Sequence, residues 1–270
     1  MNRKVVLENL EIHVAHACNL ACESCTHFSN QGHKGLVSLE EAEAWMAPWS
    51  RRLAPRSLSL LGGEPTLHPR LGDWLRLARR HFPEAVLRIV TNGFFLDRHP
   101  DLPRVMLEVG NARLFVSVHH HAPEYMARVQ PMLDLALEWR DSLGIRVNFY
   151  PSSAWWQRTY KDRGGALEPF DDGDPRASWS HCLSREARQL FEGRLYKCSP
   201  LAYLKLEDRH RKLSPAWAPY LAYRPLEPDC PDAELEAFLA LQEEPFCGMC
   251  PARPETVRIA VPFRSSPRPE

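Results

Sequence analysis

The first 150 residues of the chain alternate between short apolar runs and segments with helical periodicity. Five runs have the length of strands: residues 7–14, 57–61, 86–92, 113–120 and 145–150. They are apolar on both faces, which is typical of a parallel sheet that is covered by helices. The pattern therefore predicts an α/β fold built from βαβ units.

Helical segments occupy the intervals between these runs. Ser38 followed by Glu41 is the signature of a capping box and predicts the start of a helix, which we expect Pro48 to disturb. Three further helices are expected from the spacing of apolar residues, near 70–82, more weakly over 102–109, and over 124–143.

The pattern changes in the second half of the chain. Residues 161–180 are rich in Gly, Pro and Asp and predict a linker or mobile loop. Residues 189–198 predict a β-hairpin with its turn at Glu192–Gly193, and residues 232–242 predict an amphipathic helix. We expect three regions: a core over 1–180, a small extension over 181–252, and a frayed tail over 253–270.

Composition limits the class of protein. The 34 basic and 34 acidic residues give a net charge of zero, so no overall field attracts nucleic acid or an anionic membrane. No apolar run approaches the ~20 residues that span a bilayer, and the N-terminus lacks the features of a signal peptide. We therefore expect a cytoplasmic protein, whose 8 cysteines are metal ligands or catalytic groups rather than disulfides.

Three cysteines lie close together, directly after the first predicted strand. In the run HACNLACESC they are Cys18, Cys22 and Cys25. A closed structural zinc site uses four ligands, whereas a cubane iron–sulfur cluster held by three cysteines leaves one iron open. The alternative is a zinc site that takes His16 or His27 as its fourth ligand.

Polar, glycine-rich or metal-binding residues follow every predicted strand of the core. In parallel α/β folds, ligands bind at the carboxyl ends of the strands. The residues that follow the five strands, in order, are the cysteine triplet, Gly62-Gly63-Glu64-Pro65, Asn92-Gly93, Ser117 with His119 to His121, and Tyr150. We expect them to converge on one rim of the sheet.

The cysteine triplet after the first strand, together with GGEP after the second, resembles the radical S-adenosylmethionine (SAM) enzyme superfamily. The resemblance covers about residues 8–150 and implies a partial (β/α)6 TIM-like barrel. It implies that Cys18, Cys22 and Cys25 bind a 4Fe–4S cluster whose open iron takes the amino and carboxylate groups of SAM. Cleavage of the sulfonium then yields a 5′-deoxyadenosyl radical, which abstracts hydrogen from the substrate.

The resemblance also implies which residues bind SAM in the loop after the second strand. Gly62 and Gly63 allow the backbone to approach the methionyl ammonium, because glycine has no side chain and permits positive φ. Glu64 pairs with that ammonium, and Pro65 completes the motif.

Further SAM contacts are implied beyond this loop. Ser117 and His119 match the family positions that meet the ribose and carboxylate, and Asn92 is another candidate. The family usually has an aromatic residue before the third cysteine, near the adenine. Ser24 stands there in this chain, and Phe28 is the nearby residue expected to substitute.

Four later cysteines resemble the twitch extension of this superfamily, a shortened SPASM region that holds one auxiliary 4Fe–4S cluster. They are Cys182, Cys198, Cys247 and Cys250, and the extension is expected to contain the β-hairpin and a helix. Four cysteines ligate a cubane fully, so the expected role of the cluster is electron transfer. A four-cysteine zinc site is the alternative.

These expectations define a function. We expect a radical SAM enzyme with two 4Fe–4S clusters that abstracts hydrogen from a small polar metabolite, such as a sugar, nucleoside or amino acid, with oxidation through the auxiliary cluster. The candidate bases are His119, His121 and Tyr150. The expected partners are the substrate, SAM and an electron donor such as flavodoxin or ferredoxin, with no nucleic acid and no membrane.

Three alternatives remain open. A peptide-modifying enzyme of the same superfamily (a RiPP maturase) is less favoured, because little chain precedes Cys18 for a leader-binding module. An epimerase requires a thiol as hydrogen-atom donor, for which Cys230 is the candidate, although an ordinary buried thiol is the simpler interpretation. A non-enzymatic zinc-binding module is the third.

Overall fold

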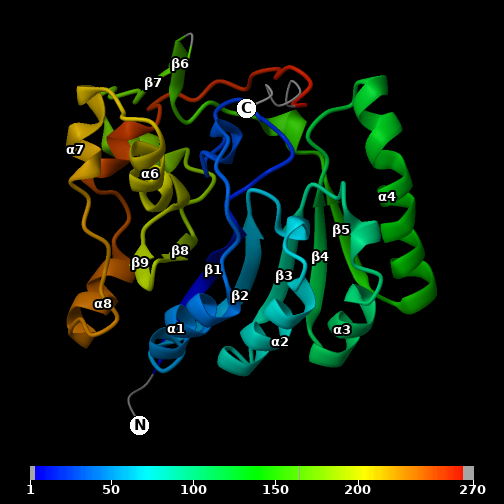
Figure 1. Ribbon diagram of the computed structural model, residues 1–270. Coiled ribbons are helices and arrows are strands. Elements are labelled where there is room, and N and C mark those ends of the chain that lie inside the picture. Colours follow the sequence, from blue (N-terminus) through cyan, green and yellow to red (C-terminus); the bar gives the residue numbers. More distant parts are fainter. Residues whose placement is uncertain (1–3, 164, 264–270) are drawn as a thin grey trace.

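The computed structural model describes residues 4–163 and 165–263 and has one large, mainly parallel β-sheet (Figure 1). The strand order is β5-β4-β3-β2-β1-β8-β9. The strands are β1 (Val5–Ala15), β2 (Leu53–Gly62), β3 (Val86–Thr91), β4 (Ala112–Ser117), β5 (Arg146–Tyr150), β8 (Ala187–Phe191) and β9 (Arg194–Tyr196). All neighbours pair in parallel except β8 and β9. This confirms the predicted α/β class with a partial-barrel sheet.

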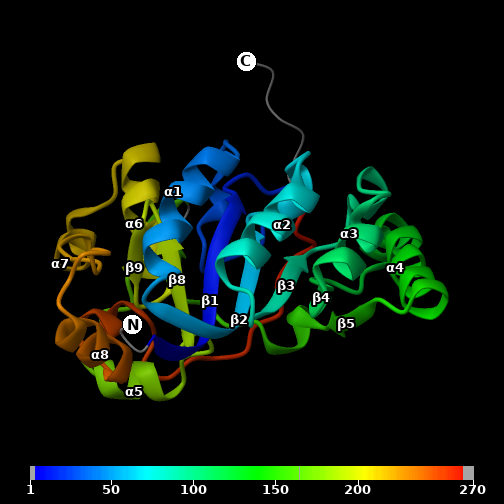
Figure 2. The same ribbon diagram turned by 90° about the horizontal axis from the view of Figure 1, so that it is seen from below.

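The predicted helices of the first half are all present. They are α1 (Leu39–Trp49), α2 (Leu71–His81), α3 (Leu102–Val109) and α4 (Pro123–Leu143). The capping box of α1 is confirmed, because Ser38 Oγ accepts from the Glu41 N–H at 3.1 Å and the Glu41 carboxylate accepts from the Ser38 N–H at 2.9 Å. Pro48 lies inside α1, one residue before its end. Figure 2 shows α1, α2 and α3 along the same face of the sheet.

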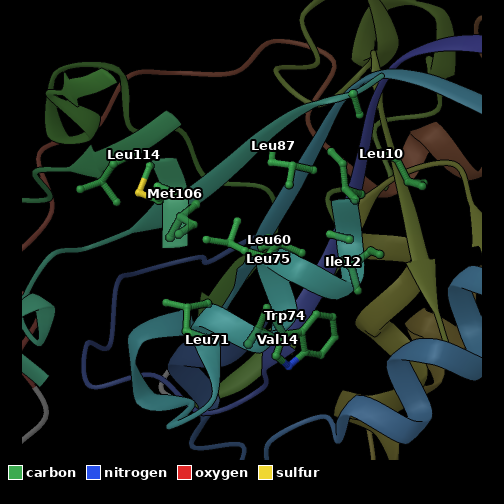
Figure 3. Packing of buried hydrophobic residues seen from close by; sticks show 14 of the residues in the cluster. Leu10, Ile12, Val14, Leu60, Leu71, Trp74, Leu75, Leu87, Met106 and Leu114 are labelled. Carbon is green, nitrogen blue, oxygen red and sulfur yellow. The ribbon is translucent and has the colours of Figure 1, made fainter. Parts of the chain in front are cut away.

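The main core lies between the sheet and these helices (Figure 3). Alternate strand residues point toward the helices, as the period of two requires. Leu10, Ile12, Leu60, Leu87 and Leu114 come from the strands, and they pack with Leu71, Trp74 and Leu75 of α2 and Met106 of α3. One face of the sheet is therefore apolar and covered, which leaves the other face for polar side chains.

The prediction of a linker over residues 161–180 is wrong. This segment contains the antiparallel pair β6 (Lys161–Arg163) and β7 (Ala166–Glu168) and the short helix α5 (Pro175–Ser180). Asp174 caps α5, since its carboxylate accepts from the Ala177 N–H at 2.9 Å. Gly, Pro and Asp here form turns and a helix start rather than an irregular loop.

The predicted hairpin is confirmed, but its place in the fold was not foreseen. Glu192 and Gly193 both have positive φ (49° and 76°), as a two-residue hairpin turn requires. β8 pairs in parallel with β1, from Asn9 opposite Ala187 to Ile12 opposite Leu190. The hairpin is thus a continuation of the main sheet.

The second half of the chain adds helices around this hairpin. They are α6 (Ser199–His210), α7 (Ala218–Leu221) and α8 (Asp232–Ala240), the last of which the sequence predicted. Single turns of 3-10 helix are Ser29–Gln31, Pro65–Leu67, Leu96–Arg98, Ser152–Trp155, Pro215–Trp217 and Pro245–Met249. A second core of aromatic side chains forms here, around Tyr160, Tyr203 and Trp217.

The end of the chain packs against the loop that holds the cysteine triplet. The Ala21 N–H donates to the Pro262 carbonyl at 2.8 Å, and Leu20 forms an isolated antiparallel β-bridge with Phe263. The expectation of a frayed tail is therefore wrong up to residue 263, and residues 264–270 lie outside the described part of the chain. Among the described helices, none has both the length and the apolar character needed to cross a bilayer.

The core is tested by two leucine substitutions. Leu60, two residues before the end of β2, is 0% exposed, whereas Leu107 on α3 is 56% exposed. We expect Leu60→Ala to lower the free energy of unfolding by about 2–5 kcal/mol, because it removes buried methyl groups and leaves a cavity. Leu107→Ala is the matched control and should change it by less than about 0.5 kcal/mol in urea denaturation. Equal losses would contradict this packing.

Candidate active site

The loop after β1 carries Cys18, Cys22 and Cys25, at the carboxyl edge of the sheet. The Leu20 N–H donates to Cys18 Sγ at 3.4 Å. The Asn92 amide, directly after β3, donates to Asn19 Oδ1 at 2.8 Å and lies 3.9 Å from Cys18 Sγ. The end of β3 is therefore tied to the cysteine loop, and Asn92 stands beside a cluster-ligand candidate.

The glycine pair after β2 lies directly against the cysteine loop. The Gly63 N–H donates to the Ala15 carbonyl at 2.8 Å, and the Glu64 N–H donates to the Ala17 carbonyl at 2.9 Å. A Cβ at Gly62 would stand 2.2 Å from the Ala15 oxygen, and one at Gly63 would stand 2.3 Å from the Ala17 oxygen. Both glycines are required because the chain approaches itself here, whatever ligand the loop also meets.

Glu64 is completely buried and joins two segments of the rim, the loop after β2 and the end of β3. Its Oε1 accepts from the Thr66 N–H (2.9 Å) and from the hydroxyls of Thr66 and Thr91 (2.5 Å each). Its Oε2 accepts from the Asn92 N–H at 2.7 Å. Burial raises the pKa of Glu64, and these hydrogen bonds lower it. Most of the acceptor capacity of the carboxylate is thus used inside the protein.

Ser117, His119, His121 and Tyr150 all follow β4 or β5. Ser117 is opposite Tyr150 in the sheet register, and the His119 N–H donates to the Tyr125 hydroxyl at 3.1 Å. The His119 ring lies edge-on to Trp156, 5.7 Å between centroids. Burial lowers the pKa of His119 to about 4, so its imidazole is neutral near pH 7. His121 is exposed, and Tyr150 is 51% exposed.

The structure argues against Phe28 as the residue that stacks on adenine. Its side chain is 0% exposed and stacks on Tyr160, with centroids 5.0 Å apart and planes 13° apart. Ser24 also has an internal role, because its Oγ accepts from the N–H groups of Thr159 (2.8 Å) and Tyr160 (3.1 Å). These residues anchor the cysteine loop to the second core.

The four later cysteines come together from three separate segments. Cys182 follows α5, Cys198 directly precedes α6, and Cys247 and Cys250 lie at the last 3-10 turn. Burial raises the pKa of all four thiols. The nearby Cys182, Cys198 and Cys247 also raise the pKa of Cys250. The segments that carry the four cysteines pack together, since Ser178 Oγ of α5 donates to the Cys250 carbonyl at 3.0 Å.

Cationic side chains accompany this cysteine quartet. Lys197 and Arg188 lower the pKa of Cys182, in opposition to burial. A tetrathiolate ligand set is strongly anionic, so buried cations beside it reduce the cost of its charge. Within residues 4–163 and 165–263, no three His, Cys, Asp or Glu side chains surround one point closely enough to hold a single metal ion.

The candidate role of Cys230 as hydrogen-atom donor is wrong on the evidence of its position. Its Sγ is 3.2 Å from Arg52 Nη1, and Arg52 directly precedes β2. The cysteine loop begins at the opposite end of the same strand pair, where Ala15 is opposite Gly62. Nine residue steps of about 3.3 Å separate the two edges, or about 30 Å.

Some residues that shape the rim were not predicted from the sequence. They are Thr66 and Thr91, which hold Glu64, Asn19, which holds Asn92, and the alanines that meet the glycine pair. A threonine two residues after Glu64 is a local signal for a capping contact. The other contacts join residues far apart in the chain, and no local signal announces them.

The glycine pair is tested by Gly63→Ala. We expect it to lower the free energy of unfolding by about 1–3 kcal/mol, because the added Cβ would overlap the backbone carbonyl of Ala17, which cannot rotate away. Gly72→Ala in α2 is the control, since its Cβ would meet only the Val105 side chain at 3.3 Å. Chemical denaturation measures both. A Gly63→Ala protein as stable as the wild type would contradict the close approach.

Comparison with known proteins agrees with this geometry. The family model described as "Radical SAM superfamily" matches residues 12–137. The probable GTP 3′,8-cyclase of Saccharolobus solfataricus is 34% identical over 113 residues, 42% of this chain and 35% of the relative. The GTP 3′,8-cyclase of Sulfurovum sp. is 26% identical over 157 residues, 54% and 46% of the two chains.

Each match thus spans less than half of the relative's length. A solved structure of BtrN in complex with AdoMet and 2-DOIA is 20% identical, covers 73% of this chain and 75% of its own, and has a TM-score of 0.47. The region that matches the family model, residues 12–137, begins in β1 and contains the cysteine triplet, the glycine pair and the ends of β3 and β4. Residues 12–137 of the chain are thus similar to the radical SAM superfamily.

Proposed function

We propose that this chain is an enzyme that cleaves SAM reductively and abstracts a hydrogen atom from a small polar metabolite. The observation that carries the proposal is the contact between the glycine pair and the cysteine loop, which brings the two motifs of the superfamily onto one rim. The superfamily implies a 4Fe–4S cluster and SAM. When bound, this pair of groups supplies a 5′-deoxyadenosyl radical.

Different residues of this rim are proposed to bind the cluster and SAM. Cys18, Cys22 and Cys25 would hold the cluster and leave one iron for SAM. The backbone beside Gly62 and Gly63, kept rigid by the Ala15 and Ala17 contacts, would receive the methionyl end. Glu64 would hold the loop in place. Its Oε2, which accepts one hydrogen bond where Oε1 accepts three, would face the SAM ammonium.

The ends of β4 and β5 are proposed to bind the other end of SAM and the substrate. Ser117 and His119 would meet the ribose and carboxylate, and the neutral imidazole of His119 can donate or accept a hydrogen bond without adding charge. Tyr150, exposed opposite Ser117, and His121 remain the candidate bases. Such a base would take the proton lost when the substrate radical is oxidised.

An auxiliary 4Fe–4S cluster is proposed at Cys182, Cys198, Cys247 and Cys250. The support is that the segments carrying them pack together: Ser178 Oγ of α5 donates to the Cys250 carbonyl at 3.0 Å, and the Lys197 ammonium, next to Cys198, lies 3.6 Å from the Glu244 carboxylate. A fully ligated cluster would accept the electron of the substrate radical, so the net reaction would be a two-electron oxidation. A flavodoxin or ferredoxin would supply the electron that starts it.

A nucleotide is the first substrate to examine. Two relatives that match part of the chain are described as GTP 3′,8-cyclases, and a nucleoside belongs to the class of small polar metabolites expected from the sequence. Turnover of GTP, and of simpler nucleosides and sugars, would be followed by transfer of deuterium from the labelled substrate into 5′-deoxyadenosine.

The two cysteine sets are distinguished by their iron content. After anaerobic reconstitution we expect about eight iron per wild-type chain, since each cubane contains four. Cys22→Ser should lose about half of the iron and all release of 5′-deoxyadenosine from SAM. Cys198→Ser should lose about half of the iron and retain that release, because the auxiliary cluster does not bind SAM.

Cys230→Ser is the matched control and should keep both properties, because Cys230 lies at the opposite edge of the sheet. A colourless wild-type protein that contains zinc and no sulfide would contradict the proposal. Retention of all the iron by Cys198→Ser would contradict the auxiliary cluster alone.

A further inference from the structure

A row of polar side chains crosses the sheet on the face opposite α1 and α2. The register places Gln189, Glu11, Ser59, Arg88, Arg113 and Arg146 side by side on successive strands. Their chain neighbours, such as Leu10, Leu87 and Leu114, point into the helix-covered core (Figure 3). Because side chains alternate along a strand, the members of the row project from the other face.

The β8-β1-β2 part of this row is a closed hydrogen-bond network. Glu11 accepts from the amides of Asn9 (2.8 Å) and Gln189. Ser59 Oγ donates to Asn9 Oδ1 at 3.0 Å, and the Tyr203 hydroxyl of α6 donates to Gln189 Oε1 at 3.2 Å. The only carboxylate of the row is therefore already engaged by neutral partners, and α6 covers this part of the face.

The β3-β4-β5 part of the row is cationic. Arg88, Arg113 and Arg146 are direct cross-strand neighbours, and like charges in such positions repel. Within the described residues, none of the three forms an ion pair, in contrast to surface arginines such as Arg76, which pairs with Glu108 at 2.8 Å. This part of the row lacks the anion that would balance it.

The two inner arginines also have unused hydrogen-bond donors. The Nε atoms of Arg88 and Arg113 are buried, and neither has a hydrogen-bond partner in the described part of the chain. The Arg88 guanidinium lies over the Phe115 ring, 5.5 Å from its centroid. Burial and the nearby Arg113 lower the pKa of Arg88, and the more distant Glu11 only partly opposes them. Buried donors without acceptors are rare in folded proteins, and a bound ligand that supplies the acceptors is one explanation for them.

The position of these arginines relates them to the candidate active site. Arg113 precedes Ser117 by four residues on β4, which is about 13 Å along a strand. Adjacent strands are about 4.8 Å apart, so the guanidinium groups of Arg88 and Arg113 can reach one ligand. A small molecule that reacts at the strand ends can therefore extend one end down the sheet to the arginine pair.

We infer that Arg88 and Arg113 bind an oxyanion, a phosphate or a carboxylate, that belongs to the substrate of this enzyme. The inference rests on the proposed function and narrows the substrate to an anionic small molecule. A guanidinium donates two parallel hydrogen bonds to either kind of oxyanion, and such charge-assisted bonds are about twice as strong as neutral ones. The ligand would supply both the missing acceptors and the missing negative charge.

The test uses inorganic pyrophosphate and malonate as probes of the reconstituted full chain, at constant ionic strength set with chloride. We expect at least one anion to bind the wild type by calorimetry and to raise its melting temperature by several degrees. Arg88→Gln and Arg113→Gln should weaken this binding at least tenfold. The control Arg56→Gln, at an exposed arginine paired with Glu8, should bind as the wild type does. Preference for pyrophosphate assigns a phosphate, and preference for malonate assigns a carboxylate.

Stability without ligand provides a second readout. Without an anion, Arg88→Gln and Arg113→Gln should melt at or above the wild-type temperature, because each removes a repulsive charge. A clear fall in that temperature, or anion binding equal to that of the wild type, would overturn the inference, as would no binding of either probe. Failure of the proposed function is separate, since it would appear as no 5′-deoxyadenosine from the wild type.

Discussion

Two stretches of backbone meet at the ends of β1 and β2 with no space for a side chain between them, and the candidate active site depends on this contact. The N–H groups of Gly63 and Glu64 donate to carbonyls of the segment that leads into Cys18. Because β1 and β2 are paired strands in the centre of the sheet, these hydrogen bonds hold the cysteine loop to a rigid part of the fold. A ligand held between cysteines and glycines would thus meet a preorganised surface rather than two independent loops.

Buried polar groups extend this rigidity across the rim. The Glu64 carboxylate collects donors from the β2 loop and from the end of β3, while Asn92 is joined to Asn19 of the cysteine loop. The hydroxyls of Thr66 and Thr91 and the Asn92 N–H therefore share one acceptor group, and loss of the Glu64 carboxylate would leave all three buried donors uncompensated. The second core contributes from the other side, because Ser24 fastens the cysteine loop to residues 159 and 160.

Charge is distributed unevenly over the faces and edges of the sheet. Thiol groups lie together at two places, the loop after β1 and the quartet of Cys182, Cys198, Cys247 and Cys250. Lys197 and Arg188 lie near the quartet. On the face opposite α1 and α2, Glu11 is held in a closed hydrogen-bond network, and the Nε atoms of Arg88 and Arg113 have no hydrogen-bond partner in the described part of the chain. The net charge of zero thus conceals an uneven placement of charged groups over the sheet.

The sequence by itself determined the elements of the first half of the chain, the hairpin, α8 and the residues that follow the core strands. Apolar runs, the Ser38 capping box and the Glu192–Gly193 turn are local signals, and the α/β class followed from the alternation of the apolar runs with helical segments. The cysteine motif can be read directly from its spacing. Only the tertiary structure decided that β8 pairs with β1, that Phe28 is buried on Tyr160, and that Cys230 lies at the far edge. The arginine row likewise appears only in the folded sheet. The physical reason is that neighbours across strands are set by pairing order and register, which arise from packing of the whole chain and leave no local pattern.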